Sequence, residues 1–163
     1  MAPMVRMNMQ PFRNICLKYG ADYVFSEEII DRKLIWCQRV INEELNTIDF
    51  ISTRDSVVVF RTTAAEKSRL ILQIGSNNPI TALKAVELLQ DDIYGVDVNM
   101  GCPMKFSTSG GMGAALMKDK QNATNIVKAL VEKFGHKLSV SCKIRCLDNF
   151  DDTLNFVLSM QNE

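Results

Sequence analysis

The sequence predicts an α/β fold, and more narrowly an incomplete (β/α)8 TIM barrel made of about the first five βα units. Short apolar runs alternate with amphipathic stretches along the chain, which is typical of parallel βαβ units. Polar or reactive residues follow strand after strand, whereas a doubly wound sheet gathers them mainly at one crevice. A complete barrel takes about 250 residues, so the 163 residues of this chain hold only part of one.

The first half of the chain alternates between the two kinds of element. Runs of apolar residues predict strands at MVRM near residue 4, at residues 22–27 and at residues 56–62. Apolar spacings of three and four predict helices at residues 11–19 and 29–41, the second being IIDRKLIWCQRVI.

The second half continues the alternation with longer runs. Strands are expected at residues 69–76, 94–102 and 138–146. Helices are expected at residues 79–90, at residues 122–134 and from about Asp151 onward. Pro79 suits the first turn of its helix, because that position needs no backbone N–H. We find no repeat and no linker that would divide the chain into two domains.

Charge and hydropathy narrow the classes of partner. The 19 Lys and Arg residues balance 19 Asp and Glu residues, so the composition gives no support for RNA binding, although local basic clusters can act alone. No apolar run approaches the roughly 20 residues that a membrane span needs. The start, MAPMVRMNMQ, lacks the long apolar stretch of a secretory signal. We therefore expect no membrane partner.

The five cysteines include no CxxC pair, and the single histidine, His136, has no ligand-spaced neighbour. A metal site is therefore not expected. An odd number of cysteines fits a reducing, cytoplasmic location better than a secreted disulfide framework.

Cys102 is the candidate catalytic residue. It lies between a glycine and a proline, which fixes a tight backbone turn directly after a predicted strand. A thiol with an ordinary pKa of about 8.5 keeps its proton at neutral pH and can donate it as a general acid, or it can act as a nucleophile. The alternative is a small buried apolar side chain, which is what most free cysteines are.

Two features flank this thiol. Asn99 has the donor and acceptor to read a base or an amide, and it can equally cap the local backbone. The glycine-rich run GGMGAALM, residues 110–117, could approach a phosphate or a nucleic-acid backbone closely, or it could be a plain flexible loop. It matches neither a P-loop nor GxGxxG.

Lys143 and Arg145 alternate along CKIRC and therefore share one face of a strand. Two cations inside a barrel require an anionic partner, such as a reduced flavin, unless they point past the strand end into water. Gln73, in an otherwise apolar strand, requires hydrogen-bond partners, which a flavin ring edge could also supply. The pair Glu27–Glu28 is interpreted as a polar strand end without acid–base work.

Several of these runs, in this order, resemble a known family. DVNMGCP and the downstream GGMGAALM resemble the signature of the tRNA-dihydrouridine synthases, which are FMN enzymes built on a (β/α)8 barrel. Four further runs are similar to that family, namely APMV at the start, EEII at 27–30, LQIGSNNP at 72–79 and CKIR at 142–145. The segment RVINEELNTIDF and the strand SVVVFRT look most like the eukaryotic branch that acts at tRNA position 20.

The resemblance implies an activity and a set of residue roles. NADPH or NADH would reduce FMN, hydride would pass from the reduced flavin to C6 of uracil, and Cys102 would protonate C5. The cofactor-binding residues would be Pro3, Met4, Val5, Gln73 and Lys143. Asn99 and Arg145 would hold the flipped uracil of the tRNA substrate, and Lys105 would contact a phosphate.

The resemblance also implies that residues 1–163 are the N-terminal portion of the flavin-binding barrel domain, without its C-terminal half and without tRNA-binding domains. An unclosed parallel sheet exposes its edges, so self-association of the chain is expected. Two alternatives stay open: a truncated, non-catalytic product, and a flavin barrel that acts on a free pyrimidine, as dihydroorotate dehydrogenases do.

Overall fold

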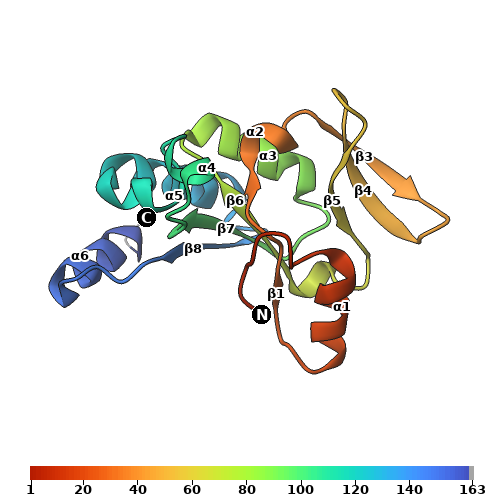
Figure 1. The fold of residues 1–163 in the computed structure, drawn as a ribbon, viewed down its shortest axis with the longest axis horizontal. Helices are drawn as coiled ribbons and strands as arrows, with labels where there is room; N and C mark the ends of the chain where they lie inside the picture. Colours follow the sequence, from red (N-terminus) through yellow and green to blue (C-terminus); the bar gives the residue numbers. More distant parts are fainter. Residues whose placement is uncertain (162–163) are drawn as a thin grey trace.

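A parallel sheet forms the centre of the computed structural model, which describes residues 1–161. Its strands run in the order β1-β6-β7-β8, and β2 also pairs with β6 (Figure 1). The strands are β1 (Val24–Phe25), β2 (Ile29–Ile30), β6 (Leu70–Gly75), β7 (Gly95–Met100) and β8 (Ser139–Ile144). Sheet order follows chain order without a reversal, which is the arrangement of a barrel and not of a doubly wound sheet. The predicted partial barrel is thus confirmed.

The two shortest strands form one interrupted edge. β1 pairs with Leu70 and Ile71 of β6, and β2 pairs with Ile74 and Gly75 further along the same strand. In the gap between them, the hydroxyl of Ser26 accepts a hydrogen bond from the backbone N–H of Gln73 at 2.8 Å. A side chain therefore replaces one ladder hydrogen bond where Glu27 and Glu28 leave the sheet.

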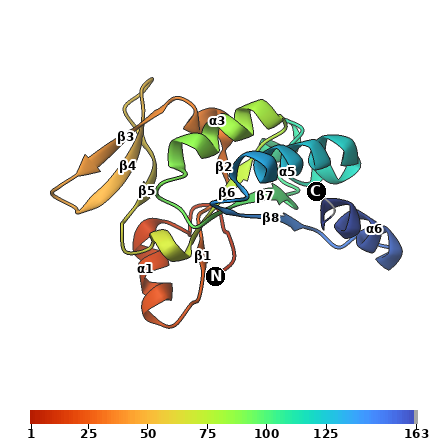
Figure 2. The same ribbon diagram turned by 180° about the vertical axis from the view of Figure 1, so that it is seen from behind.

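Alternation along the strands divides the sheet into an apolar face and a polar face. Alternate residues of β6 and β7 are fully buried on one side, namely Leu70, Leu72, Ile74, Val96, Val98 and Met100. Helices α3 (Pro79–Leu89) and α5 (Lys120–Phe134) cover this side (Figure 2). Helix α6 (Phe150–Gln161) packs on α5 and buries Phe156. Register places Gln73, Asp97 and Ser141 beside one another on the opposite face.

Most predicted helices and strands are confirmed to within a few residues, including α1 (Gln10–Lys18). Helix α3 begins where the sequence indicates, since the side chain of Asn78 accepts hydrogen bonds from the N–H groups of Ile80 and Thr81. Two short helical segments follow β7, namely α4 (Lys105–Thr108) and the 3-10 helix η2 (Gly113–Lys118). No helix within residues 1–161 combines the length and apolar character that crossing a membrane requires.

The predicted first strand near residue 4 is wrong, because this segment forms a turn. The carbonyl of Met4 accepts hydrogen bonds from the N–H groups of Met7 and Asn8, and Arg6 has a positive φ of 65°. The side-chain amide of Asn8 donates to the carbonyls of Ala2 and Phe25 at 2.8 and 2.9 Å. The N-terminal segment is therefore tied to β1 by a side chain in place of a ladder.

The predicted helix over residues 29–41 is also wrong. Only α2 (Asp31–Leu34) is helical, and β3 (Cys37–Asn42) follows it. β3 pairs antiparallel with β4 (Thr47–Ser52), which pairs with β5 (Val58–Thr62) to form a separate sheet beside the barrel. Asn46, at φ 51°, makes the tight turn between β3 and β4. The β-branched pair Val40–Ile41 suits a strand once that partner is available.

One buried ion pair joins α1 to the segment after β5. Two nitrogens of the Arg13 guanidinium, Nε and Nη2, donate to the two carboxylate oxygens of Glu66 at 2.8 and 2.7 Å. The side chains are only 2% and 0% exposed. Thr62 donates to the same carboxylate at 2.9 Å. The network fixes α1 and the small antiparallel sheet relative to each other.

Candidate active site

Cys102 lies just beyond the carboxyl end of β7, and Asn99 shapes the turn that holds it. The Oδ1 atom of Asn99 accepts hydrogen bonds from the N–H groups of Gly101 and Cys102 at 3.0 and 2.9 Å. Burial is the main cause that raises the pKa of the Cys102 thiol, and the nearby Glu28 carboxyl raises it further. The thiol is therefore protonated at neutral pH, as a general acid requires.

The glycine-rich run packs against the turn that holds Cys102. Gly113 has φ +57°, and a Cβ at this position would lie 2.5 Å from both the Cys102 carbonyl oxygen and the Ser107 hydroxyl. The N–H of Ala114 donates to that same Cys102 carbonyl at 2.9 Å. The C-terminal part of this run is therefore packed against Cys102, whereas Gly110 and Gly111 are exposed.

Gly113→Ala is expected to lower the free energy of unfolding by about 1–3 kcal/mol, because it combines a strained φ with a clash against backbone. Urea denaturation of the purified protein measures this change. Gly20→Ala is the matched control, since Gly20 also has positive φ, at +92°, but nothing lies within 4 Å of its Cβ position. Equal losses in the two variants would show that the close contact with Cys102 contributes nothing.

A line of polar side chains crosses the polar face of the sheet and ends at the thiol loop. Gln73 donates to Asp97 at 2.7 Å, and Ser141 donates to the other Asp97 oxygen at 2.8 Å. The side-chain amide of Asn99 donates to the Oε1 atom of Gln73 at 3.1 Å. Gln73 thus lies inside β6, with its amide engaged by protein partners. Burial raises the pKa of Asp97.

The two predicted cations also reach this region. Lys143 lies opposite Asn99 in the register and is exposed, with no hydrogen bond or salt bridge to any residue within 1–161. Arg145 Nη1 lies 3.4 Å from the carbonyl oxygen of Gly101, beside Cys102. Cys142 and Ile144 face the helices, as strand alternation predicts, and burial raises the pKa of Cys142 to about 11.

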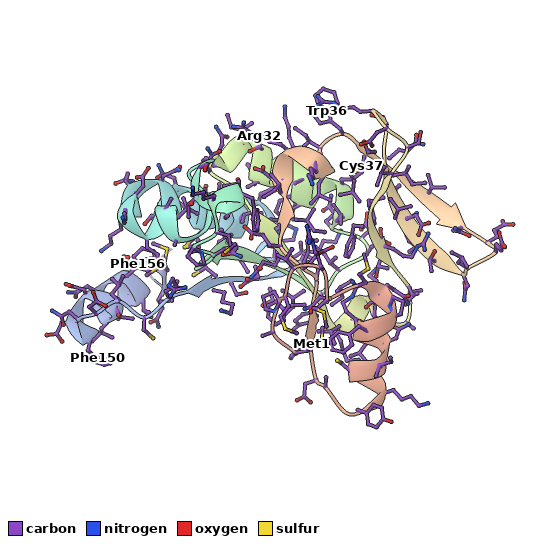
Figure 3. All side chains as sticks on the ribbon, viewed as in Figure 1. Met1, Arg32, Trp36, Cys37, Phe150 and Phe156 are labelled. Atoms are coloured by element: carbon purple, nitrogen blue, oxygen red, sulfur yellow. The ribbon has the colours of Figure 1, made fainter. Side chains whose placement is uncertain are left out.

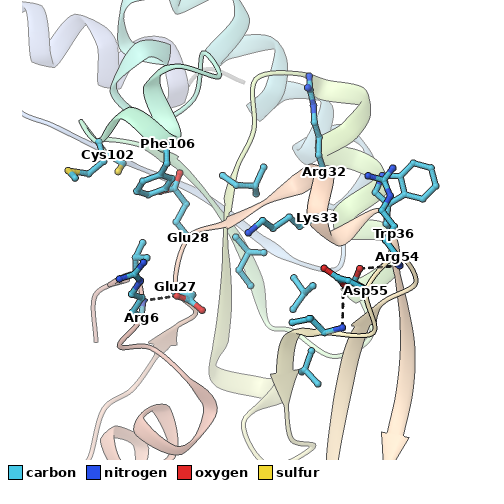
Figure 4. Close-up of a pocket in the computed structure, with 18 residues that line it drawn as sticks. Arg6, Glu27, Glu28, Arg32, Lys33, Trp36, Arg54, Asp55, Cys102 and Phe106 are labelled. Atoms are coloured by element: carbon cyan, nitrogen blue, oxygen red, sulfur yellow. Dashed lines mark hydrogen bonds between the residues drawn. The ribbon is translucent and has the colours of Figure 1, made fainter.

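A pocket of about 1000 Å³ opens beside Cys102. Figure 4 shows Cys102, Phe106 and Glu28 at one end, and Trp36 with Arg54 at the other. Of the predicted site residues, Val5 and Cys102 line it. The others lie outside its lining, namely Pro3, Met4, Gln73, Asn99, Lys105, Lys143 and Arg145. Lys105 is exposed on α4.

Sequence reasoning missed two acidic residues of this site. Glu28, interpreted as a polar strand end, is 8% exposed and accepts a hydrogen bond from Ser107 at 3.0 Å. Asp97, 2% exposed, is the centre of the polar line. Asp97 lies between two apolar residues of a predicted strand, as Gln73 does, so the sequence alone could have indicated that it needs buried partners. Glu28 offered no such signal, because its neighbours come from distant segments.

Comparison with known proteins decides the family. The family model described as dihydrouridine synthase (Dus) matches residues 1–163. The chain belongs to the dihydrouridine synthase family. Over 96% of its length, this dihydrouridine synthase chain is 43% identical to a tRNA-dihydrouridine(20) synthase of Schizosaccharomyces pombe and 44% identical to one of Saccharomyces cerevisiae. A tRNA-dihydrouridine(20a/20b) synthase of Saccharomyces cerevisiae is 34% identical over 93% of the chain.

The resemblance seen in the sequence is thereby confirmed, including its closeness to enzymes named for position 20. The names of these relatives specify NAD(P)+. The dihydrouridine synthase chain spans 34% and 43% of the length of the two position-20 relatives. Within residues 1–161, no three or more His, Cys, Asp or Glu side chains are grouped so as to hold a metal ion.

Proposed function

We propose that the protein to which this chain belongs reduces uridine to 5,6-dihydrouridine at position 20 of the tRNA D-loop, with FMN as cofactor and NADPH or NADH as reductant. Residues 1–163 would form the N-terminal portion of its flavin-binding barrel domain. The names of the 43–44% identical relatives support the substrate and the reductant. One observation carries the chemistry: a thiol whose pKa is raised by burial lies at the carboxyl end of a barrel strand, beside a large pocket.

The residues around Cys102 are suited to a proton transfer. The side-chain Oδ1 atom of Asn99 accepts hydrogen bonds from two successive N–H groups of the turn, so the turn that carries the thiol is fixed before any substrate arrives. In the proposed reaction the S–H bond breaks as a C–H bond forms at C5 of uracil. Asn99 keeps one N–H and Arg145 most of its donors for the base, which supports their proposed role in holding it.

The polar face of the sheet fits a flavin. Lys143 is a cation without a hydrogen bond or salt bridge among the described residues, at the end of a face that otherwise holds paired polar groups. Met4 and Val5 expose apolar surface, 44% each, which could pack against a ring beside Pro3. When bound, FMN would supply hydride to C6 of uracil. Lys143 would stabilise the negative charge near N1 of the reduced ring.

The far end of the pocket supports an RNA substrate. The Arg54 guanidinium stacks 4.0 Å from the centre of the Trp36 ring. Trp36 is 46% exposed and projects from the surface beyond α2 (Figure 3). Arg6, Arg32 and Lys33 also line the pocket. An aromatic face with surrounding cations suits the base and phosphates of a nucleotide strand, even though the chain as a whole carries no net charge.

The test is reduction of an unmodified tRNA transcript by the purified protein with FMN and NADPH, followed by mass spectrometry of its nucleosides. We expect dihydrouridine at position 20 and none in a transcript with cytidine there. Faster reduction of free uridine than of tRNA would favour the free-pyrimidine alternative. A protein that binds no flavin and leaves the transcript unchanged would favour the non-catalytic alternative.

Lys143→Ala is expected to weaken FMN binding about 10- to 100-fold, because it removes one charge-assisted contact. A titration followed by the visible absorbance of bound flavin measures the dissociation constant. Lys105→Ala is the matched control, since that cation is exposed on α4, outside the polar face. Unchanged affinity in Lys143→Ala would remove this residue from the flavin site.

A further inference from the structure

The Glu28 carboxyl is held in a buried position near the Cys102 thiol. Its Oε1 atom accepts the hydrogen bond of Ser107, and it lies 2.6 Å from the position that a Cβ on Gly75 would take. Its Oε2 atom is buried and receives no hydrogen bond from the described residues. A buried carboxylate oxygen without a donor is costly, so the arrangement calls for a function.

The same small region contains the thiol. A Cβ on Gly113 would lie 2.5 Å from the Ser107 hydroxyl and 3.2 Å from the Cys102 Cβ. The Ser107 hydroxyl, which donates to the carboxyl, therefore lies close to the loop of Cys102. Glu28 and Cys102 line the same end of the pocket (Figure 4). Each of the two groups also shifts the pKa of the other.

We propose that Glu28 is the carboxylate partner of Cys102, a positioning residue that keeps the thiol protonated and favours its reprotonation by water after each transfer. The inference rests on the general-acid role proposed above for Cys102. When the thiol proton passes to C5 of uracil, the thiolate that remains lies beside the Glu28 carboxyl. At a pH where that carboxyl is ionised, two neighbouring negative charges in a partly buried site repel each other, so the thiolate takes a proton from water, hydroxide leaves to the solvent, and the S–H bond is restored.

Two cations outside the pocket lining lie near the loop of Cys102, namely Arg145, whose Nη1 is 3.4 Å from the Gly101 carbonyl oxygen, and Lys105 on α4. Burial is the main cause that raises the pKa of Glu28, and the hydrogen bond from Ser107 lowers it. The cations and other carboxylates that line the rest of the pocket are Arg6, Glu27, Arg32, Lys33, Arg54 and Asp55. Even with a raised pKa, a carboxyl is ionised at the alkaline pH where a thiol titrates, so its charge acts there.

The experiment is the pH dependence of Cys102 alkylation by iodoacetamide, read peptide by peptide by mass spectrometry. Only the thiolate reacts, so the midpoint of the profile reports the thiol pKa. Glu28→Gln keeps the shape of the side chain and the acceptor for Ser107 but removes the charge. We expect the Cys102 midpoint to fall by about one pH unit, which is a tenfold faster reaction below both midpoints.

The neighbouring Glu27→Gln is the matched control, because Glu27 accepts its hydrogen bond from the backbone N–H of Arg6 at 2.6 Å and Cys102 is not among its partners. The exposed Cys146 in the same digest reports any general change in reactivity. If Glu28→Gln does not fold, Glu28→Asp withdraws the carboxylate by one methylene and should also lower the midpoint. A folded variant of either kind with the wild-type midpoint would overturn the proposal.

The two proposals fail separately, because alkylation needs neither tRNA nor flavin. If the alkylation midpoint shifts in Glu28→Gln but the protein does not reduce tRNA, the Glu28–Cys102 pair is supported and the proposed reduction of uridine is refuted. In an active protein, a general acid loses activity as the pH rises through its pKa. The alkaline limb of kcat/KM, which reports the free enzyme, should therefore move to lower pH in Glu28→Gln by the same amount as the alkylation midpoint.

Discussion

Cys102→Ala is expected to slow the reduction of uridine in tRNA about 10²- to 10⁴-fold while FMN remains bound, because it removes the proton donor alone. The substituted side chain lies outside the polar face that carries Lys143, so the flavin spectrum should not change. Single-turnover reduction of a tRNA transcript, started from reduced flavin, measures the affected step directly.

Cys142→Ala is the matched control for this variant. Cys142 is on β8, and its side chain faces the helix-covered side of the sheet. The Cys142→Ala variant should reduce uridine at the wild-type rate. Normal turnover by Cys102→Ala would rule out the general acid, and equal losses in the two variants would indicate a general effect of removing a thiol.

Glu66→Ala is expected to lower the free energy of unfolding by about 3–5 kcal/mol, because it leaves the guanidinium of Arg13 buried without a counter-charge. Arg13 would keep its hydrogen bonds to the carbonyls of Asn8 and Arg61 but lose both contacts to the carboxylate. Urea denaturation followed by circular dichroism measures the loss.

Glu87→Ala is the control for this ion pair. Glu87 pairs with Lys133 at 2.9 Å, but the side chains are 54% and 42% exposed, so the expected loss is below about 1 kcal/mol. A loss in Glu66→Ala as small as that in Glu87→Ala would contradict the prediction. Replacing Arg13 and Glu66 together with apolar residues should destabilise less than Glu66→Ala, because no unpaired charge remains.

The parallel strands were predictable because β6 is a mostly apolar run and because apolar residues alternate along β7 and β8. The structure of residues 29–41 was not predictable, because their apolar spacing fits a helix as well as it fits a strand. Pairing with β4, a segment that comes later in the chain, decides the outcome in favour of β3. Pattern reasoning within one window has no access to that partner.

The same distinction applies to the candidate site. Cys102 and Asn99 could be proposed from sequence because they lie at the end of one strand, within three residues of each other. Glu28 reaches the thiol only through folding, since its hydrogen-bond donor Ser107 is 79 residues away in the chain. Asp97 needs Gln73 and Ser141 from two other strands to become the centre of a network. The roles of all the candidate site residues stay predictions.

The interruption between β1 and β2 sets a limit on attempts to make this protein more robust. A redesign that joined them into one continuous strand would restore ladder hydrogen bonds now replaced by the hydroxyl of Ser26. It would also impose strict alternation on Ser26, Glu27 and Glu28, and the carboxyl beside Cys102 would lose its freedom to leave the sheet. Under the proposed role of Glu28, a change in these three residues that raises stability would therefore move the carboxyl away from Cys102, and one that keeps the carboxyl in place would leave the strand interrupted.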